Sequence, residues 1–310
     1  MGRYSVALGK IGPTCNPNNP CSGKYGKCLD LKLTNECNGN CPFCIEAKGY
    51  SPQNTASAEK LAETINAQDI QTVLILGGEP LLYPDIVKLL SLIRKDLNIV
   101  LTTNGSLLTP DLASAMTPYI KGMNISIHHS TSAKHEELTK IKFNSETLYK
   151  SIHAFGANKI RINCNLVKGY VDTRSEAEAM CGMVRRLGVT KLRFAELQNC
   201  PALYVNARDI FVGFGGLSAD PFKDGCEVPI TYKPFDNMEV LVRVTCGIID
   251  PNKPPVENPT GRNINSQVMY SDRQIVAGWL QENGFPINSC HIPNNSPSGS
   301  CGRTSLGSCS

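Results

Sequence analysis

Three cysteines near the N-terminal end of the chain have the spacing of a metal-binding loop. Cys37, Cys41 and Cys44 form the pattern C-x3-C-x2-C and follow a run at residues 29–33 with the alternation of a β-strand. Three thiolates in such a loop can bind three irons of a [4Fe-4S] cubane and leave the fourth iron without a protein ligand. A structural zinc site is one alternative, although closed zinc sites use four ligands. Chance clustering in a chain with 14 cysteines is another.

The cysteine loop and a glycine-rich turn resemble the radical S-adenosylmethionine (SAM) family. The family's cysteine pattern includes an aromatic residue, which is Phe43 here, and its GGEP element is matched by Gly77, Gly78, Glu79 and Pro80. A lone GGEP is typical of a simple turn, but this one lies one β/α unit after the cysteine loop. The resemblance implies that the amino and carboxylate groups of SAM chelate the open iron. An electron from the cluster would then break the C5′–S bond of SAM.

The resemblance also implies roles for individual residues. The backbone and carboxylate of the GGEP element would hold the SAM ammonium, and the Phe43 backbone would meet the adenine. Polar residues of later strands are candidates for binding the ribose and the methionyl carboxylate, or for the site more generally: Thr103, Asn104, Ser126, Asn163 and Glu196. The strands around Asn163 and Glu196 resemble the molybdopterin-cofactor cyclase branch of the superfamily. One departure is His128-His129, where many relatives carry an acidic residue; such a pair is more typical of structural, hydrogen-bonded groups than of acid/base catalysts.

The periodicity around these motifs predicts an α/β fold. Six strand-then-helix units imply right-handed crossovers and a parallel sheet, curved into a partial (β/α)6 TIM-type barrel with its chemistry at the C-terminal strand ends. We divide the chain into an irregular N-terminal arm at 1–26, a radical SAM core barrel at 27–198 and a C-terminal extension at 199–310. In the extension we expect β-hairpins at 227–246 and 268–279.

The extension also contains candidate ligands for an auxiliary iron-sulfur cluster. Cys226 and Cys246 are equidistant from the turn of the first expected hairpin, so they would lie opposite each other. With Cys290, Cys301 or Cys309 they could form a second site, as C-terminal extensions do in many relatives; ordinary buried or free thiols are the alternative. Cys164 and Cys181 fall in a predicted strand and a predicted helix, where small core residues are expected.

Composition limits the classes of partner. The 310 residues are 41% hydrophobic and 19% charged with a net charge of +4, which is typical of a globular protein without a strong attraction to nucleic acid or anionic membranes. No apolar run approaches the roughly 18 to 20 residues of a membrane span, and no signal core follows Met1, so we expect a cytoplasmic protein. A metal-binding nucleic-acid protein is the non-enzyme alternative, although aromatic residues make up only 6% of the chain.

Together these patterns predict an enzyme that generates a 5′-deoxyadenosyl radical and abstracts hydrogen from a substrate. An electron donor such as flavodoxin or ferredoxin would reduce the cluster. For the substrate we favour a ribosomally made precursor peptide, with a peptide-recognition protein as a candidate partner. This hypothesis depends on the irregular arm and the cysteine-bearing extension, which could shape an open cleft. The cyclase-like strands suggest the alternative, a small molecule such as a nucleotide or sugar.

Overall fold

The computed structural model describes most of the chain between Cys28 and Ala277. The described ranges are 28–44, 51–197, 200–212, 227–230, 237–243 and 266–277. Their strands are β1 (Cys28–Lys32), β2 (Thr72–Leu76), β3 (Asn98–Thr103), β4 (Gly122–Ser126), β5 (Ile160–Asn165), β6 (Lys191–Ala195), β7 (Glu227–Ile230), β8 (Glu239–Arg243), β9 (Ser266–Tyr270) and β10 (Ile275–Ala277). Their helices are α1 (Ala58–Asn66), α2 (Ile86–Leu92), α3 (Pro110–Met116), α4 (Ser132–Thr139), α5 (Ser145–Phe155), α6 (Arg174–Arg186) and α7 (Ala207–Phe211), with short 3-10 turns η3 (Pro80–Leu82), η4 (Ala157–Lys159) and η5 (Pro201–Leu203).

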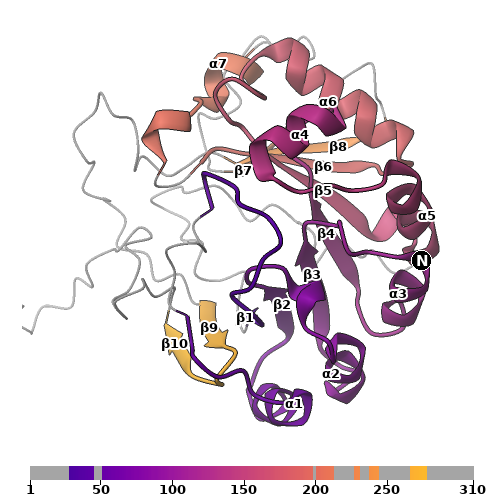
Figure 1. Ribbon diagram of the computed structural model, residues 1–310, viewed down its shortest axis with the longest axis vertical. Helices are drawn as coiled ribbons and strands as arrows, with labels where there is room; N and C mark the ends of the chain where they lie inside the picture. Colours follow the sequence, from indigo (N-terminus) through magenta and orange to yellow (C-terminus); the bar gives the residue numbers. More distant parts are fainter. Residues whose placement is uncertain are drawn as a thin grey trace, which may run out of the picture.

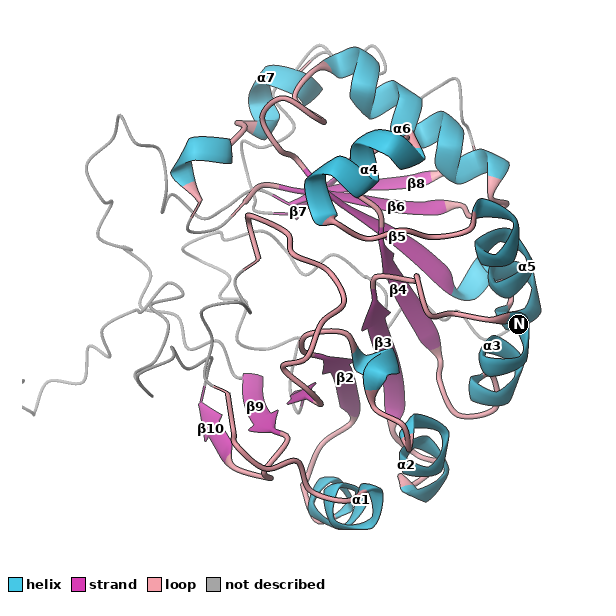
Figure 2. Ribbon diagram, viewed as in Figure 1, coloured by secondary structure: helices cyan, strands magenta, loops and turns pink. Residues whose placement is uncertain are grey.

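The strands form one curved sheet with the order β10-β9-β1-β2-β3-β4-β5-β6-β8-β7. All pairings from β9 to β8 are parallel, and β10 and β7 add an antiparallel strand at each edge. The helices α1, α2, α3, α5 and α6 follow the outside of the arc (Figures 1 and 2). No pairing among the described residues joins the two edge strands. The predicted partial TIM-type barrel is therefore confirmed.

Local sequence signals account for several helix starts. Thr109 precedes Pro110 and accepts a hydrogen bond from the Leu112 N–H, which satisfies one of the open donors at the start of α3. Thr173 and Glu176, spaced as a threonine three residues before a glutamate, form a capping box at the start of α6. None of the helices in the described ranges is long and apolar enough to cross a membrane.

Two features of the topology differ from the sequence-based expectation. Both expected hairpins exist, but β8 pairs in parallel with β6 and β9 pairs in parallel with β1, so the hairpins extend the core sheet at both ends. The sequence also gave no indication of α4, because its residues are mostly polar and form no continuous apolar stripe. The domain boundaries stay a prediction, and the N-terminal arm lies outside the described residues.

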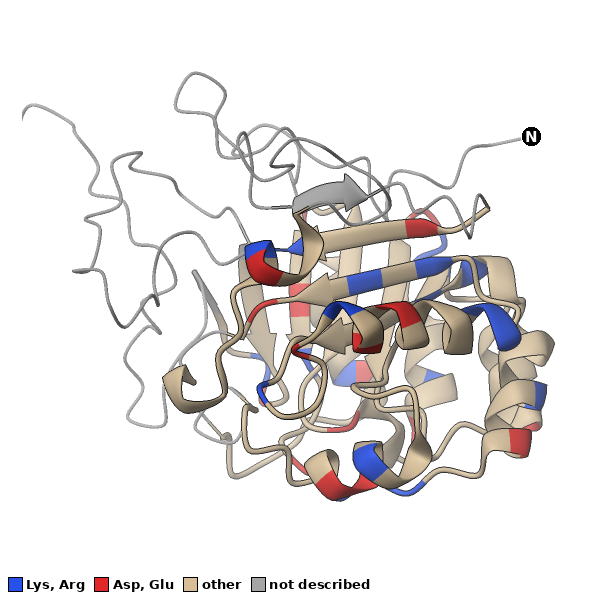
Figure 3. Cartoon of the chain, turned by 90° about the horizontal axis from the view of Figure 1, so that it is seen from above, with Lys and Arg blue, Asp and Glu red and all other residues tan. Residues whose placement is uncertain are grey.

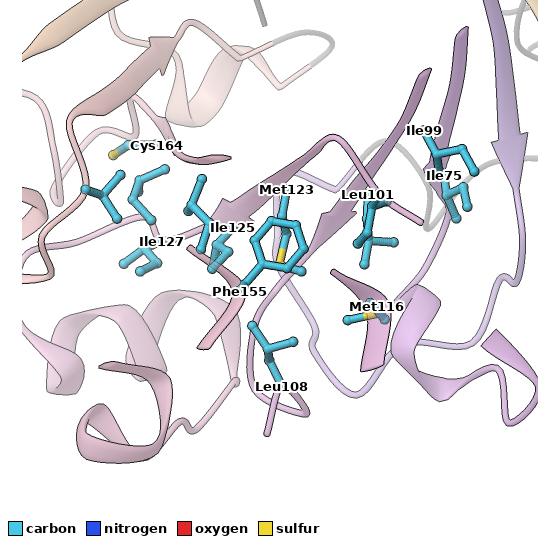
Figure 4. Close-up of a cluster of buried hydrophobic side chains, with 14 of the residues drawn as sticks. Ile75, Ile99, Leu101, Leu108, Met116, Met123, Ile125, Ile127, Phe155 and Cys164 are labelled. Atoms are coloured by element: carbon cyan, nitrogen blue, oxygen red, sulfur yellow. The ribbon is translucent and has the colours of Figure 1, made fainter. Parts of the chain in front are cut away.

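The hydrophobic core lies between the sheet and the outer helices. Ile75, Leu101, Met123 and Ile125 project from neighbouring strands toward the helices, where Phe155 of α5 packs among them (Figure 4). Successive side chains of a strand point to opposite faces. The residues between these core positions therefore line the inner face of the arc, which carries charged and polar groups as well as apolar ones: Asp30, Lys32, Thr102, Asn124, Ser126, Arg161, Asn163 and Arg193. Figure 3 shows Lys and Arg segments on the strands as well as on the surrounding helices.

Candidate functional site

The cysteine loop leaves the C-terminal end of β1 and docks on the end of α4. The Asn40 N–H donates to the Thr139 carbonyl at 2.8 Å. A Cβ atom on Gly39 would lie 2.6 Å from Cδ1 of Ile141, so a larger residue at position 39 would require the Ile141 side chain or the loop to move. On the other side of the loop, the buried ring of Phe43 belongs to a small apolar cluster with Leu138 of α4. These contacts fix the backbone that carries the three cysteines.

The three thiols of this loop lie close enough to influence one another electrostatically. Cys37 is exposed, whereas Cys41 and Cys44 are half-buried. Burial, followed by the nearby Cys44 and Cys37 thiols, raises the pKa of Cys41 to about 12. The Gly39 N–H also donates to Sγ of Cys37 at 3.4 Å. Three neighbouring thiolates are stable together only with a compensating cation, which is the donor chemistry of an iron-sulfur cluster.

The described residues contain no group of three or more His, Cys, Asp or Glu arranged to hold a single metal ion. A cubane differs from a single ion in this respect, because each cysteine of the loop binds a separate iron. Its ligands therefore need not converge on one point. The loop of Cys37, Cys41 and Cys44 fits a [4Fe-4S] cluster on these grounds.

The GGEP turn extends the parallel pairing of β1 and β2 up to the cysteine loop. The Gly78 N–H donates to the Thr34 carbonyl and the Glu79 N–H donates to the Glu36 carbonyl, both at 2.7 Å. Gly77 has φ +132°, and a Cβ atom on it would overlap the Thr34 carbonyl oxygen. A Cβ atom on Gly78 would overlap the Glu36 carbonyl oxygen. Both glycines are therefore required for the close approach of the two backbones.

The Glu79 carboxylate joins the turn after β2 to the turn after β3. Its side chain is fully buried and accepts hydrogen bonds from Thr103 Oγ1 (2.6 Å), the Asn104 N–H (2.7 Å) and the Leu81 N–H (3.0 Å). Burial raises the pKa of Glu79, and these hydrogen bonds oppose the shift. The carboxylate thus braces the chain's own backbone and the Thr103 side chain. A direct contact of Glu79 with SAM stays a prediction, as does the role of buried Pro80.

Side-chain amides connect the cysteine loop to the turn after β3. Asn104 Nδ2 donates to Asn38 Oδ1 and Asn38 Nδ2 donates to Ser106 Oγ, both at 2.8 Å. Ser106 in turn donates from its N–H and hydroxyl to Asn104 Oδ1. Thr103 and Asn104 are therefore part of a network that reaches residue 38, next to the first cysteine. Sequence reasoning missed Asn38 and Ser106; the position of Asn38 between two cysteines was the available signal.

Two further predicted residues lie side by side on the inner face of the sheet. Ser126 of β4 is in register with Asn163 of β5, which is in register with Arg193 of β6. Arg161 Nε donates to Asn163 Oδ1 at 3.1 Å. Glu196 differs from them, because its Oε1 accepts the Ala207 N–H at 2.8 Å and so holds the first turn of α7. The binding roles of Ser126, Asn163 and Glu196 toward SAM stay predictions.

Two buried histidines lie beside the cysteine loop: His128, which belongs to the pair noted in the sequence, and His135, which sequence reasoning missed. His128 Nδ1 accepts the Asn165 N–H at 3.0 Å, and its ring meets the Phe43 ring edge-on with a centroid distance of 5.0 Å. His135 Nδ1 accepts the His128 N–H at 3.1 Å. Burial is the main cause that lowers the pKa of His128 to about 3 and that of His135 to about 4. Both rings are therefore neutral at physiological pH.

The remaining cysteine predictions divide into two groups. Cys164 and Cys181 are fully buried in the hydrophobic core, as expected, and Figure 4 shows Cys164 beside the core side chains. The candidate ligands of an auxiliary cluster lie outside the described residues: Cys226, Cys246, Cys290, Cys301 and Cys309. The auxiliary cluster stays a proposal.

Comparison with solved structures supports the fold. Streptococcus suis SuiB, in a structure described as bound to S-adenosylmethionine, aligns with a TM-score of 0.58 at 15% identity and covers 82% of this chain and 60% of SuiB. At this identity the likeness concerns the fold alone.

Sequence comparisons identify the superfamily. Residues 31–184 match the radical SAM superfamily. The mitochondrial GTP 3′,8-cyclase of Arabidopsis thaliana is 29% identical over 162 residues, which is 48% of this chain and 41% of that protein. The GTP 3′,8-cyclase of Aquifex aeolicus (strain VF5) is 29% identical over 183 residues, which is 55% of this chain and 56% of that protein. The chain thus spans about half the length of these two relatives. With the matched segment containing both the cysteine loop and the GGEP turn, the chain belongs to the radical SAM superfamily.

Proposed function

We propose that this chain is a radical SAM enzyme that acts by hydrogen abstraction. A [4Fe-4S] cluster held by Cys37, Cys41 and Cys44 would pass one electron from an external reductant to bound SAM, and this reductive cleavage would supply the radical that abstracts hydrogen from the substrate. The observation that carries this proposal is the docking of the cysteine loop against the GGEP turn. The Glu79 N–H reaches the Glu36 carbonyl, which immediately precedes Cys37, at 2.7 Å.

The chain's own residues would supply binding, orientation and exclusion of water. Cys37, Cys41 and Cys44 would hold three irons and leave the fourth iron for SAM. Beside Cys41, a small apolar cluster would keep water away from one side of the loop; it consists of Phe43, Leu138, Val167 and Leu197. A low local dielectric strengthens the interactions of charged groups within such a site.

The polar residues at the strand ends would orient SAM. The backbone groups of residues 77–80 would meet its ammonium, and Ser126 and Asn163 would meet its ribose or carboxylate. Thr103, Asn104 and Glu79 would act mainly by holding the turns after β2 and β3 in place, since their polar groups bind one another. The enzyme would work in the cytoplasm. An electron donor such as flavodoxin or ferredoxin would reduce its cluster.

The inner face of the sheet favours an anionic small molecule as substrate. Arg161 and Arg193 come from neighbouring strands, and Lys32 lies on the same face, 5.2 Å from the centroid of the Tyr270 ring. Guanidinium groups bind phosphate and carboxylate with two parallel hydrogen bonds. The sequence relatives named GTP 3′,8-cyclase, two of them 29% identical to this chain, make a nucleotide the first such molecule to test.

A precursor peptide, the class favoured from the sequence, is the second candidate. The edge strands β10 and β7 are unpaired with each other among the described residues, and an unclosed sheet of this kind would leave room for an extended chain. SuiB, which shares this fold at 16% identity, is described as bound to its precursor peptide SuiA. A fold of this type can therefore admit a peptide.

The chemistry is tested by anaerobic reconstitution with iron and sulfide, followed by incubation with SAM and dithionite. We expect 5′-deoxyadenosine from the wild type and none from the variant Cys37→Ala/Cys41→Ala/Cys44→Ala. The matched control is Cys164→Ala, which removes a thiol from the core and should keep the activity. Turnover that persists in the triple variant would refute the proposal, as would a protein that binds stoichiometric zinc and no iron.

The substrate classes are separated by binding measurements on the reconstituted protein. For the anionic class we expect GTP to bind and Arg193→Gln to weaken it by more than about tenfold, because a hydrogen bond between charged groups contributes roughly 1.5 to 3 kcal/mol. Arg186→Gln, on α6, is the matched control and should bind as the wild type does. Binding of a leader peptide together with equal GTP affinity in both variants would favour the peptide class.

A further inference from the structure

Helix α4 is joined to the ends of β4 and β5 through two imidazoles in series. The Asn165 N–H, at the end of β5, donates to His128 Nδ1. The His128 N–H, just after β4, donates to His135 Nδ1 in the middle of α4. The two rings stack with their centroids 6.0 Å apart. Because burial keeps both rings neutral by lowering their pKa values, Nδ1 of each ring stays a hydrogen-bond acceptor.

The C-terminal end of α4 contacts the cysteine loop. The Thr139 carbonyl accepts the Asn40 N–H at 2.8 Å, and Sγ of Cys41 lies 4.0 Å from the same oxygen. Thr139 Oγ1 donates to the His135 carbonyl and accepts the Ile141 N–H, which fixes the last turn of the helix. Ile141 then fills the space below Gly39. In Figure 1 the indigo segment that follows β1 runs past α4, as these contacts require.

The path from the strand ends to the cysteine loop is therefore short and continuous. It runs from Asn165 through His128 and His135 to Thr139 and Asn40, with every step a hydrogen bond or one turn of helix. The His128 ring also contacts the Phe43 ring of the cysteine loop edge-on, which is a second connection between the loop and this path. His128 follows Ser126, one of the residues proposed to bind SAM, by two positions in the sequence. Groups that must act together are effective only when their mutual distance is fixed.

We propose that α4 positions the cysteine loop relative to the ends of β4 and β5. His135 is the positioning residue of this helix. His135 acts through His128 and Thr139 and touches neither SAM nor substrate. The inference deepens the proposed function, on which it depends only for the identity of the group that the loop binds. Measurements on the cysteine loop in cluster-free protein test the role of α4 separately from the proposed function.

The first test compares His135→Leu with His135→Asn. The asparagine Oδ1 can replace Nδ1 as the acceptor for the His128 N–H, whereas leucine leaves this buried donor without a partner. In cluster-free protein, we expect hydrogen exchange of the Asn40 amide to be faster in His135→Leu and close to wild type in His135→Asn. In reconstituted protein, the concentration of SAM that shifts the electron paramagnetic resonance spectrum of the reduced cluster should rise by roughly 10- to 100-fold in His135→Leu alone.

Wild-type values for His135→Leu in both measurements would overturn the proposal. Equal damage in His135→Asn and His135→Leu would overturn it too, because the acceptor would then be irrelevant. If His135 acted only on folding, His135→Leu would change the melting temperature without changing the spectral response to SAM, and this result would overturn the proposal as well.

The second test works at the other end of α4 and does not depend on whether the His135 variants fold. Gly39→Ala should push the loop and the Ile141 side chain apart, because the new methyl group meets Ile141 Cδ1 and Cγ1 at 2.6 and 2.7 Å. Gly39→Ala/Ile141→Ala removes both atoms and leaves the Thr139 carbonyl oxygen at 3.3 Å as the next contact. We expect iron uptake and Asn40 amide protection to fall in the single variant and to recover in the double variant, with Ile141→Ala as the control.

A double variant as impaired as Gly39→Ala would contradict the seating of the loop on α4. If the wild type takes up no iron, the proposed function fails, whereas the amide protection of Asn40 still decides the role of α4.

Discussion

Gly78 lies where the GGEP turn meets the cysteine loop, and its replacement by alanine tests how the site is built. The new Cβ atom would overlap the Glu36 carbonyl oxygen, and the neighbouring atoms belong to the backbone, so no side-chain rotation can relieve the overlap. The two backbones must separate. The hydrogen bonds from the Gly78 N–H to Thr34 and from the Glu79 N–H to Glu36, both 2.7 Å long, would lengthen or break.

The magnitude follows from these two effects. Two backbone hydrogen bonds contribute about 0.5 to 1.5 kcal/mol each, and overpacking costs about 1 to 3 kcal/mol, so we expect Gly78→Ala to lower the free energy of unfolding by about 4 kcal/mol. For a domain of this size that corresponds to a fall in melting temperature of roughly 8 to 16 °C. Iron uptake should fall as well, because Glu36 directly precedes Cys37.

Gly182→Ala, within α6, is the matched control. Its new Cβ atom would meet only Arg186 Nη1, at 3.6 Å, an ordinary van der Waals distance. Alanine stabilises a helix interior by about 0.5 to 1 kcal/mol relative to glycine, so the melting temperature should rise slightly with unchanged iron uptake. Thermal unfolding followed by circular dichroism and a colorimetric iron assay measure both quantities. A Gly78→Ala variant that melts and takes up iron as the wild type does would refute this account of the turn.

Three further predictions concern the fold around the site. Thr173→Ala removes the capping box of α6 and should lower the free energy of unfolding by about 1 kcal/mol, measured by urea unfolding. Because burial raises the pKa of Glu79, the folded chain binds this proton more tightly than the unfolded chain, and the stability of the wild type relative to Glu79→Gln should fall as pH rises through the folded-state pKa. A flat difference in urea titrations across this pH range would contradict that assignment. Cys164→Ala should destabilise the chain by about 1 to 2 kcal/mol and leave its iron content unchanged, as determined by unfolding and iron assays.

Local patterns in the sequence predicted most of the fold. The apolar run at Thr72–Leu76 predicts a buried strand and the residues Lys191–Ala195 predict another, and these are the observed bounds of β2 and β6. Capping residues such as Thr173 marked helix starts because the hydrogen bonds of a cap join residues only a few positions apart. The order of these units predicted a parallel sheet, since a strand, a helix and a second strand connect in this way.

Two elements depended on contacts that no local pattern contains. Helix α4 has few apolar residues, and its place is determined by His135, Leu138 and Thr139, which meet partners elsewhere in the fold. The pairing of β9 with β1 joins residues more than 200 positions apart in the chain. Such pairing depends on the assembled sheet, so the sequence predicted the hairpin without its place in the barrel.

The sequence by itself determined which chemical groups this protein has and their order along the chain: the cysteine spacing of the loop and the glycines of the GGEP turn. The tertiary structure decided what each polar side chain meets. Glu79 and Glu196 are both acidic residues near strand ends, yet both carboxylates accept hydrogen bonds from the chain's own backbone N–H groups. The physical reason is that a buried carboxylate is stable only beside donors, and long-range packing decides where those donors lie.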